Sequence, residues 1–265
     1  MKEYETIIYE KKNGVATITL NRPKAMNSLN MQLLAELREV LVDAQEDAGV
    51  RVLVITAKGK AFCTGADLKM VNDWSKSGDL DKEAEKAFHK AADAAFEGIE
   101  KCKKPVIAAV NGFAIAGGFE VCLWSDIVIA SEEARIGDGH ATYMLMGPIS
   151  VNLLPRQIGV KKAMELLLTG DLWPAKELEK AGLVNKVVPP DKLMEAAQEM
   201  AENIAAKSPL GSTYTKEIVK QALQAPVDVV SKYAFSVLYG LANTKDRAEG
   251  AKAFAEKRKP NFTGE

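Results

Sequence analysis

The sequence predicts an α/β protein with a mostly parallel sheet and helices concentrated towards its end. Short apolar, β-branched runs such as 52–56 and 106–110 have the continuous apolar character of strands buried on both faces. Segments with apolar residues spaced three and four apart lie between them, as in amphipathic helices. After about residue 159 the helical pattern dominates. Strands that alternate with helices favour right-handed crossovers in one sheet.

The individual elements follow from local signals. The turn at Asn13-Gly14 opens a strand over 15–20, which ends at Pro23 because proline cannot continue a strand ladder. From Asn30 the period changes to that of a helix, and residues 57–70 are expected to form a loop. Further strands are predicted at 52–56, 106–110, 127–130 and 183–188, and further helices at 80–101, 119–125, 160–168, 174–181, 191–206, 213–223 and 227–257.

The chain of 265 residues is long enough for one large domain or for a domain with a helical appendage. The shift in pattern predicts a core over 1–200 and a helical C-terminal subdomain over 201–265. No internal repeat and no low-complexity tract is found in the sequence. The composition is that of an ordinary globular protein, with 47% hydrophobic and 27% charged residues.

Charge and cysteine usage argue against several classes of protein. The net charge of -1 leaves no broad basic field for a nucleic-acid partner. Three cysteines without a CxxC pair, and only two histidines, argue against a disulfide framework and a metal site. The N-terminus lacks a signal-like apolar core, and no apolar run reaches the length of a membrane span. We therefore expect a soluble, cytoplasmic protein without a membrane partner.

Three segments that follow predicted strands carry candidate chemistry, because ligands in α/β sheets usually bind where strands end. The first is Gly65-Ala66-Asp67-Leu68. A small residue with a free N–H at this junction could donate a hydrogen bond to an incoming oxygen. The competing interpretation is an ordinary helix N-terminus, where Asp67 would be favoured in the first turn.

The second segment runs from residue 111 to residue 120 and contains the pair Gly117-Gly118. Paired glycines let backbone approach a ligand closely, and the N–H groups of a following helix favour negative charge. Two N–H donors from separate loops would form an oxyanion hole, worth about 3 kcal/mol per donor. A nucleotide-phosphate loop is the competitor, but neither GxGxxG nor GxxxxGK[ST] occurs.

Glu120 follows Gly117 by three residues, among the apolar residues Phe119, Val121 and Leu123. Apolar surroundings raise the pKa of a carboxyl group towards the range useful for proton transfer. A surface glutamate in the first turn of a helix is the alternative.

The third segment, 136–143, brings together Asp138, His140 and Tyr143. The alternative for His140 is a buried, hydrogen-bonded core histidine, and Asp138 and Gly139 are also ordinary turn residues.

Taken together, five stretches resemble the crotonase (enoyl-CoA hydratase/isomerase) superfamily in spacing and order over roughly residues 5 to 262. They are LNRPKAMNSLN (20–30), KAFCTGADLK (60–69), KPVIAAVNGFAIAGGFEVCLWSDIVIAS (104–131), IGVKKAMELLLTGDLWPAKELEKAGLVNKVVP (158–189) and FAEKRKPNF (254–262). The resemblance implies a spiral of ββα units with a C-terminal helical region that makes a trimer, with two trimers often stacked. It also implies an acyl-CoA thioester as substrate and no further cofactor.

The resemblance also assigns roles to residues. The N–H groups of Ala66 and Gly117 would form the oxyanion hole. Glu120 would activate water, and His140 stands where a second glutamate is usual. The residues expected to contact coenzyme A are Lys24, Ala25, Met26, Asp67 and Leu68, together with Phe254 and Lys257, which would reach a CoA bound to a neighbouring subunit.

The replacement of the second glutamate leaves the reaction open. Reversible hydration of a 2-enoyl-CoA to a 3-hydroxyacyl-CoA is the leading hypothesis, with His140 supplying the α-proton. Decarboxylation of a malonyl-type CoA, isomerisation and thioester hydrolysis are alternatives on the same enolate, and Asp138 and Tyr143 are reserve candidates for proton transfer. A non-catalytic acyl-CoA-binding relative is the alternative of another class. The segment 70–90, with Trp74 and Phe88, is expected to cover the acyl pocket, with bulk from Trp124, Tyr143 and Met144 nearby.

Overall fold

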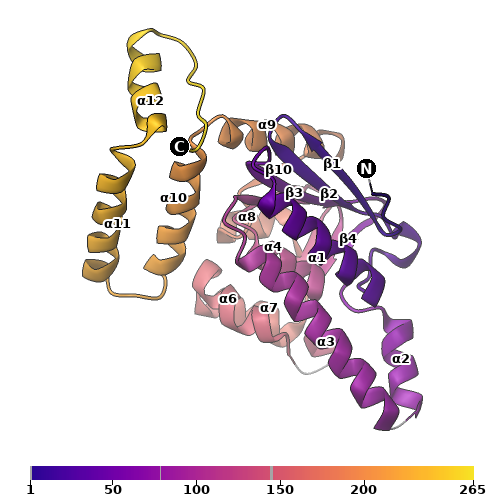
Figure 1. Cartoon of the computed structure of the whole chain (residues 1–265). Helices are drawn as coiled ribbons and strands as arrows, with labels where there is room; N and C mark the ends of the chain where they lie inside the picture. The colour runs from indigo at the N-terminus through magenta and orange to yellow at the C-terminus, as the bar shows by residue number, and fades with distance from the viewer. Residues whose placement is uncertain (1, 78, 144–145) are drawn as a thin grey trace.

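The computed structural model describes residues 2–77, 79–143 and 146–265 of the chain (Figure 1). Its strands form two sheets. The six-stranded sheet has the order β1-β2-β3-β5-β7-β10, and the four-stranded sheet has the order β4-β6-β8-β9. The strands are β1 Ile7–Lys12, β2 Val15–Leu20, β3 Val52–Ala57, β4 Ala61–Cys63, β5 Val106–Val110, β6 Phe113–Ile115, β7 Ile127–Ser131, β8 Arg135–Gly137, β9 Trp173–Pro174 and β10 Lys186–Val188. The predicted α/β class is confirmed.

Consecutive strand pairs join the two sheets. Each of the pairs β3/β4, β5/β6 and β7/β8 gives its first strand to the large sheet and its second strand to the small one, and helices follow each pair. Within each sheet these strands run parallel. The ββα unit therefore recurs in space, although no repeat is visible in the sequence. The loops that follow the short strands β4, β6 and β8 all leave from the same small sheet.

The helices are η1 Pro23–Ala25, α1 Met31–Glu46, α2 Leu68–Ser77, α3 Asp79–Glu100, α4 Gly117–Trp124, α5 His140–Tyr143, α6 Pro148–Ile158, α7 Val160–Thr169, α8 Ala175–Ala181, η2 Pro190–Lys192, α9 Leu193–Ala205, α10 Pro209–Ala222, α11 Val227–Leu241 and α12 Lys245–Ala255. α1 and α3 pack side by side on the core, and α10, α11 and α12 stand beside it (Figure 1). Across the stretches that the structure describes, no helix is long and apolar enough to cross a membrane.

Both faces of the large sheet are buried, as the continuous apolar strands predict. In β3, Leu53 and Ile55 point into the larger core with α1 and α3, whereas Val52 and Val54 point into a second cluster with α9. All four side chains are at most 1% exposed. Burying an aliphatic side chain of this size stabilises the fold by about 1.5–3 kcal/mol. The sheet is therefore a rigid base for the loops that leave it.

The C-terminal region differs from the prediction in two respects. The predicted boundary after residue 200 lies inside α9, whose Ala201 and Ala205 pack against the large sheet. The single helix predicted over 227–257 is wrong: it is broken into α11 and α12 at residues 242–244. The Thr244 side chain caps α12 by accepting a hydrogen bond from the backbone N–H of Arg247 at 3.2 Å.

Other elements were not predicted. The predicted loop over 57–70 contains β4 and the start of α2, and the small-residue stretch after β5 contains β6. β1, which pairs with β2 in antiparallel register, and α6 were not predicted either. Gly147 precedes α6, Pro148 occupies its first turn and Pro155 lies inside it, so the local signals there indicate a turn.

The end of the chain is tied to the start of α10 by one buried carboxylate. Asp246 is 4% exposed and accepts hydrogen bonds from the Ser208 hydroxyl at 2.6 Å, the Thr263 N–H at 2.7 Å and the Gly264 N–H at 3.2 Å. The Arg51 guanidinium also donates to the Phe262 carbonyl. α12 is thereby held between the tail and α10.

Asp246→Ala is expected to lower the stability of this region by ~3 kcal/mol, because three donors lose their charged acceptor. Thermal and urea unfolding followed by circular dichroism would measure the change. Asp171→Ala, at an exposed aspartate, is the matched control and should leave the midpoint unchanged. Equal midpoints for both variants would contradict the role of Asp246.

Candidate active site

Glu120 is buried in the first turn of α4, where its side chain is held inside the protein. The residue is 5% exposed, and its Oε1 accepts no hydrogen bond from any residue that the structure describes. Its N–H donates to the Ala116 carbonyl at 2.9 Å, which places it on the first turn after the glycine-rich segment. A surface glutamate is therefore the wrong interpretation. A buried carboxyl oxygen without a partner is suited to hold a polar ligand atom.

The loops that carry Ala66 and Gly117 lie against each other. A Cβ built on Gly65 would lie 2.7 Å from the Ala116 Cβ and 3.4 Å from the Gly117 nitrogen, so only glycine fits this contact, at a φ of +80°. Within the described parts of the chain, the N–H groups of Ala66 and Gly117 donate no hydrogen bond. Two free donors from separate loops are thus close together, one of them at the N-terminus of α4.

Asp138 and His140 form a buried ion pair beside these loops. The His140 Nδ1 lies 3.0 Å from the Asp138 Oδ1, and the two side chains are 15% and 2% exposed, respectively. The Ala116 N–H donates to the Asp138 carbonyl at 3.0 Å, which joins the loop after β8 to the loop before α4. The structure therefore brings the second and third candidate segments together.

Burial and neighbouring charges set the protonation of the three groups. Burial raises the pKa of Glu120 to about 7, with His140 opposing this shift and the carboxylates of Asp138 and Asp93 adding to it. Burial lowers the pKa of His140, but the hydrogen bond and charge of Asp138 outweigh this and raise it above its ordinary value. Burial likewise opposes ionisation of Asp138, yet the bond from His140 holds its pKa below the usual range. Glu120 can therefore exchange a proton near neutral pH, and the protonated form of His140 is favoured.

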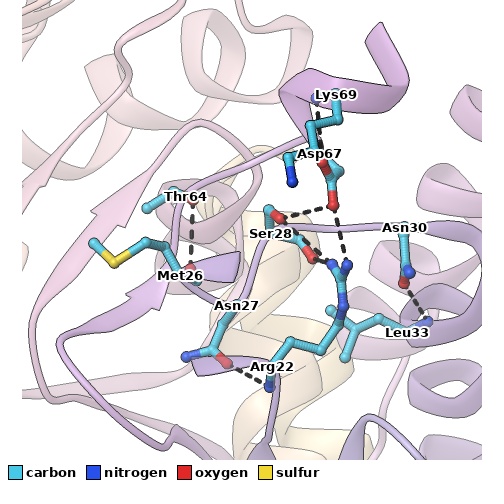
Figure 2. Close-up of polar contacts among 9 residues, drawn as sticks. All are labelled: Arg22, Met26, Asn27, Ser28, Asn30, Leu33, Thr64, Asp67 and Lys69. Carbon is cyan, nitrogen blue, oxygen red and sulfur yellow. Dashed lines mark hydrogen bonds and ion pairs between the residues drawn. The ribbon is translucent and has the colours of Figure 1, made fainter. Parts of the chain in front are cut away.

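A second polar network surrounds the loop that carries Lys24, Ala25 and Met26 (Figure 2). The Arg22 guanidinium donates to the Ser28 carbonyl and pairs with Asp67 at 3.0 Å. The Ser28 hydroxyl donates to the same Asp67 oxygen at 3.2 Å. Although Asp67 is partly buried, the Arg22 bond holds its pKa below the usual value. This network fixes the loop after β2 to the segment that begins α2.

The buried side chain of Asn27 stabilises the turn of this loop through hydrogen bonds to backbone groups. It is fully buried, accepts a hydrogen bond from the Arg22 N–H at 2.8 Å, and donates to the carbonyls of Lys58 and Ala61 at 2.8 and 2.7 Å. Met26 and Asn27 both have positive φ, of 53° and 54°, which is uncommon for residues other than glycine. The backbone around Met26 is thus held in a tight turn, with the Lys24 side chain exposed above it.

The remaining predicted contacts are exposed. Leu68 is 58% exposed at the start of α2. Phe254, in the last turn of α12, is 88% exposed, and Lys257, two residues after this helix, is also exposed. α12 lies on the opposite side of the molecule from α2 (Figure 1). Within one chain, the structure does not bring Phe254 and Lys257 to Leu68.

The aromatic residues expected near an acyl pocket are dispersed. Trp74 and Phe88 pack together with ring centroids 5.4 Å apart, which joins α2 to α3, and Phe88 is only 3% exposed. Trp124 lines a cavity of about 780 Å³ between the core and α10, which does not include Glu120 or His140. Tyr143 is 71% exposed, and Met144 lies outside the described residues.

Several residues of the site were missed from the sequence. Arg22 is not a predicted site residue, and its partner Asp67 lies 45 positions away. Gly147 is not a predicted site residue, but a Cβ there would lie 2.5 Å from the Asp138 Oδ1 and 2.7 Å from the His140 Nδ1. Asp93 on α3 acts on Glu120 although the two are far apart in sequence. An alternation of strands with loops could have indicated that such segments meet, but not which side chains pair.

Known proteins are similar to this chain in sequence and fold over almost its whole length. The sequence profile of the enoyl-CoA hydratase/isomerase family matches residues 10–265. A probable mitochondrial enoyl-CoA hydratase of Dictyostelium discoideum is 38% identical over 98% of this chain and 92% of its own length. A crotonyl-CoA hydratase of Syntrophomonas wolfei is 37% identical over 98% of both. The crystal structure of an enoyl-CoA hydratase from Bacillus anthracis is similar with a TM-score of 0.92 and 37% identity, covering 98% of this chain and all of the other.

Proposed function

This chain belongs to the enoyl-CoA hydratase/isomerase family, and from that premise we propose that it catalyses the reversible hydration of a 2-enoyl-CoA to a 3-hydroxyacyl-CoA. The observation that carries the proposal is the buried Glu120, whose unpartnered oxygen lies one turn after the free N–H of Gly117. A base next to an oxyanion site is the arrangement that water addition to a conjugated thioester requires.

We assign the oxyanion hole to the N–H groups of Ala66 and Gly117. They would donate to the thioester oxygen, which gains negative charge when water adds to the double bond and an enolate forms. Their lack of other partners among the described residues supports this role, since the donors need no rearrangement to receive the charge. Close packing at Gly65 keeps the two loops together.

We assign proton transfer to Glu120 and His140. Glu120 takes a proton from water while the water oxygen bonds to C3, and His140 gives a proton to C2 of the enolate. The pKa shifts support these roles: burial raises the pKa of Glu120 to about 7, which suits a base, and Asp138 raises the pKa of His140 in spite of burial, which favours the protonated form that an acid needs. Metal ligands and a further cofactor have no part in this scheme, in which coenzyme A belongs to the substrate.

For coenzyme A we propose the loop of Lys24, Ala25 and Met26, with the backbone at Asp67 and Leu68. The Arg22 and Asn27 contacts support this, since they hold the loop in one shape before any ligand binds. We further propose that Phe254 and Lys257 complete the CoA site of a neighbouring subunit in a trimer or a dimer of trimers. Their exposure and the position of α12 on a separate side of the molecule are consistent with this. The helices from residue 209 onwards would then form the assembly region, in a cytoplasmic protein.

A turnover screen tests the function. Purified protein would be incubated with crotonyl-CoA, a long-chain enoyl-CoA, a cyclic dienoyl-CoA and methylmalonyl-CoA, and the products analysed by mass spectrometry. A gain of water on an enoyl substrate is the expected result. Loss of carbon dioxide from methylmalonyl-CoA without any hydration would instead favour decarboxylation, the alternative that His140 in place of a glutamate leaves open. Binding of CoA without turnover of any thioester would indicate a non-catalytic relative.

The rate of hydration is expected to follow a bell-shaped pH profile. Glu120 must be ionised to accept a proton, so kcat/KM should rise as the pH passes through its pKa of about 7. His140 must be protonated, so kcat/KM should fall as the pH passes its raised pKa. Initial rates with crotonyl-CoA would be compared for wild type and His140→Gln. The variant should lose the alkaline limb and keep the acid limb, and a wild-type profile that is flat across pH 7 would contradict both assignments.

Arg22→Met is expected to raise the KM for crotonyl-CoA about tenfold with a smaller change in kcat, because the CoA loop loses a charged hydrogen bond worth about 1.5–3 kcal/mol. Asp67 also loses its counterion. Steady-state kinetics would measure the effect, with Arg38→Met, at an exposed arginine on α1, as the control. An unchanged KM would show that the Arg22–Asp67 pair does not shape the CoA site.

A further inference from the structure

Asp138 carries an inference that rests on the proposed hydration and extends it. We propose that Asp138 is a positioning residue: it accepts the Nδ1–H of His140, so that Nε2 is the only ring nitrogen left to exchange a proton with the substrate. The sequence alone offered Asp138 as a reserve proton-transfer group. The contacts of its carboxylate support a different role.

Both oxygens of the Asp138 carboxylate face His140. Oδ1 lies 3.0 Å from the ring Nδ1, and Oδ2 accepts the backbone N–H of His140 at 3.3 Å. The carboxylate thus contacts the ring and the backbone of the same residue. With its side chain 2% exposed, Asp138 is shielded from water that could compete for these bonds. A neutral imidazole has one N–H, and a carboxylate acceptor at Nδ1 places that proton on Nδ1.

The backbone is shaped for this contact. Gly139 has a φ of +66°, which allows side chains two residues apart to meet across a tight turn. The Asp138 carbonyl is held by the Ala116 N–H, directly before the oxyanion donor Gly117. This hydrogen bond therefore fixes the position of the Asp138–His140 pair relative to the oxyanion loop.

Gly147 packs directly against the Asp138–His140 ion pair. A Cβ at this position would lie 2.5 Å from the Asp138 Oδ1, 2.7 Å from the His140 Nδ1 and 2.9 Å from the His140 Cε1. These are distances that real Cβ atoms do not show, and the atoms met are those that make the bond. A side chain at Gly147 would have to displace the carboxylate, the imidazole or both.

The charges around the Asp138–His140 pair indicate whether Asp138 positions His140 or donates a proton itself. Asp138 and Glu120 are the carboxylates that act on His140 and favour its protonated form. The His140 hydrogen bond keeps the Asp138 pKa below its ordinary value in spite of burial, so Asp138 remains ionised. An ionised carboxylate has no proton to give. Asp138 therefore acts on the reaction through His140.

The proton balance of one turnover follows. Water loses a proton to Glu120 as its oxygen bonds to C3, and the electron pair of the double bond moves into the enolate. C2 then takes the Nε2 proton of the imidazolium, which leaves neutral His140 with its proton on Nδ1. The protein now holds a protonated Glu120 and a neutral His140, with the same number of protons as before. Proton exchange with solvent restores the starting form.

The two histidines of the chain make the test direct, since His89 is exposed, with 54% of its side chain accessible, and serves as an internal reference. The full-length protein, labelled with ¹⁵N-histidine, would be titrated by NMR as wild type and as Asp138→Asn. In the wild type we expect neutral His140 to carry its proton on Nδ1. In the variant the amide has no charge, so His140 should titrate at lower pH while His89 is unchanged.

Kinetics provides the second readout. Asp138→Asn should lower kcat for crotonyl-CoA by ~10²–10⁴-fold and move the alkaline limb of the pH profile to lower pH, with KM little changed. Gly147→Ala, which keeps every charge, should also weaken the His140 shift. The inference is overturned if wild-type His140 carries its proton on Nε2, or if folded Asp138→Asn leaves both the His140 titration and the alkaline limb unchanged. Failure of the wild type to hydrate any enoyl-CoA would remove the proposed function, yet the NMR result would still decide the tautomer.

Discussion

Glu120→Gln is expected to reduce hydration of crotonyl-CoA by ~10²–10⁴-fold and to leave acyl-CoA binding largely intact. Glutamine keeps the shape of the side chain in a site that is 5% exposed, but its amide cannot accept a proton from water. The lost group is the base that the proposed reaction needs, and the oxyanion donors remain. The decrease in absorbance of the conjugated thioester measures the rate, and calorimetry with crotonyl-CoA measures binding.

Glu133→Gln provides the matched control, since the same substitution is made at an exposed glutamate after β7. Its rate should equal that of the wild type. A Glu120→Gln protein that hydrates crotonyl-CoA within tenfold of the wild-type rate would remove Glu120 from the mechanism. Loss of both binding and turnover would instead mean that the carboxylate organises the site.

The features that could be predicted from the sequence are those set by local pattern. The apolar run at 52–56 is buried on both faces as β3, and the helix from Asn30 is α1, capped by the Asn30 side chain, which accepts the Leu33 N–H at 2.9 Å. The positions of Gly117 and Glu120 could also be predicted locally. A glycine-rich turn before a helix leaves the N–H of the first helical residue free and places Glu120 in the first turn of that helix.

The features that could not be predicted depend on contacts between distant segments or on competing local signals. The Arg22–Asp67 pair joins residues 45 positions apart, and nothing in the periodicity around Arg22 indicates its partner. The break between α11 and α12 is different, because the polar residues 243–247 and the capping residue Thr244 do signal it, and the prediction of one helix over 227–257 overlooks them. The close approach of Gly147 to the Asp138–His140 pair likewise arises from the packing of three segments.

Gly117→Pro is expected to lower kcat for crotonyl-CoA by ~10²–10³-fold, because proline removes one of the two oxyanion donors. Position 117 is the first residue of α4, where proline itself is compatible with the helix. The constraint lies at the preceding residue. Ala116 has a φ of 50° and a ψ of -116°, a conformation that a following proline disfavours. Circular dichroism and the thermal midpoint therefore accompany the kinetics.

Gly117→Ala separates the lost donor from the changed shape. Alanine keeps the N–H, and its Cβ would meet the Leu29 Cδ1 at 2.6 Å, the end of a flexible side chain that can shift. If the oxyanion assignment holds, folded Gly117→Pro loses far more kcat than Gly117→Ala, while both bind CoA. Equal losses in the two variants would mean that the space around Gly117, and not its N–H, limits the reaction. The comparison thus tests a single hydrogen-bond donor, which is the element of the site that the backbone alone supplies.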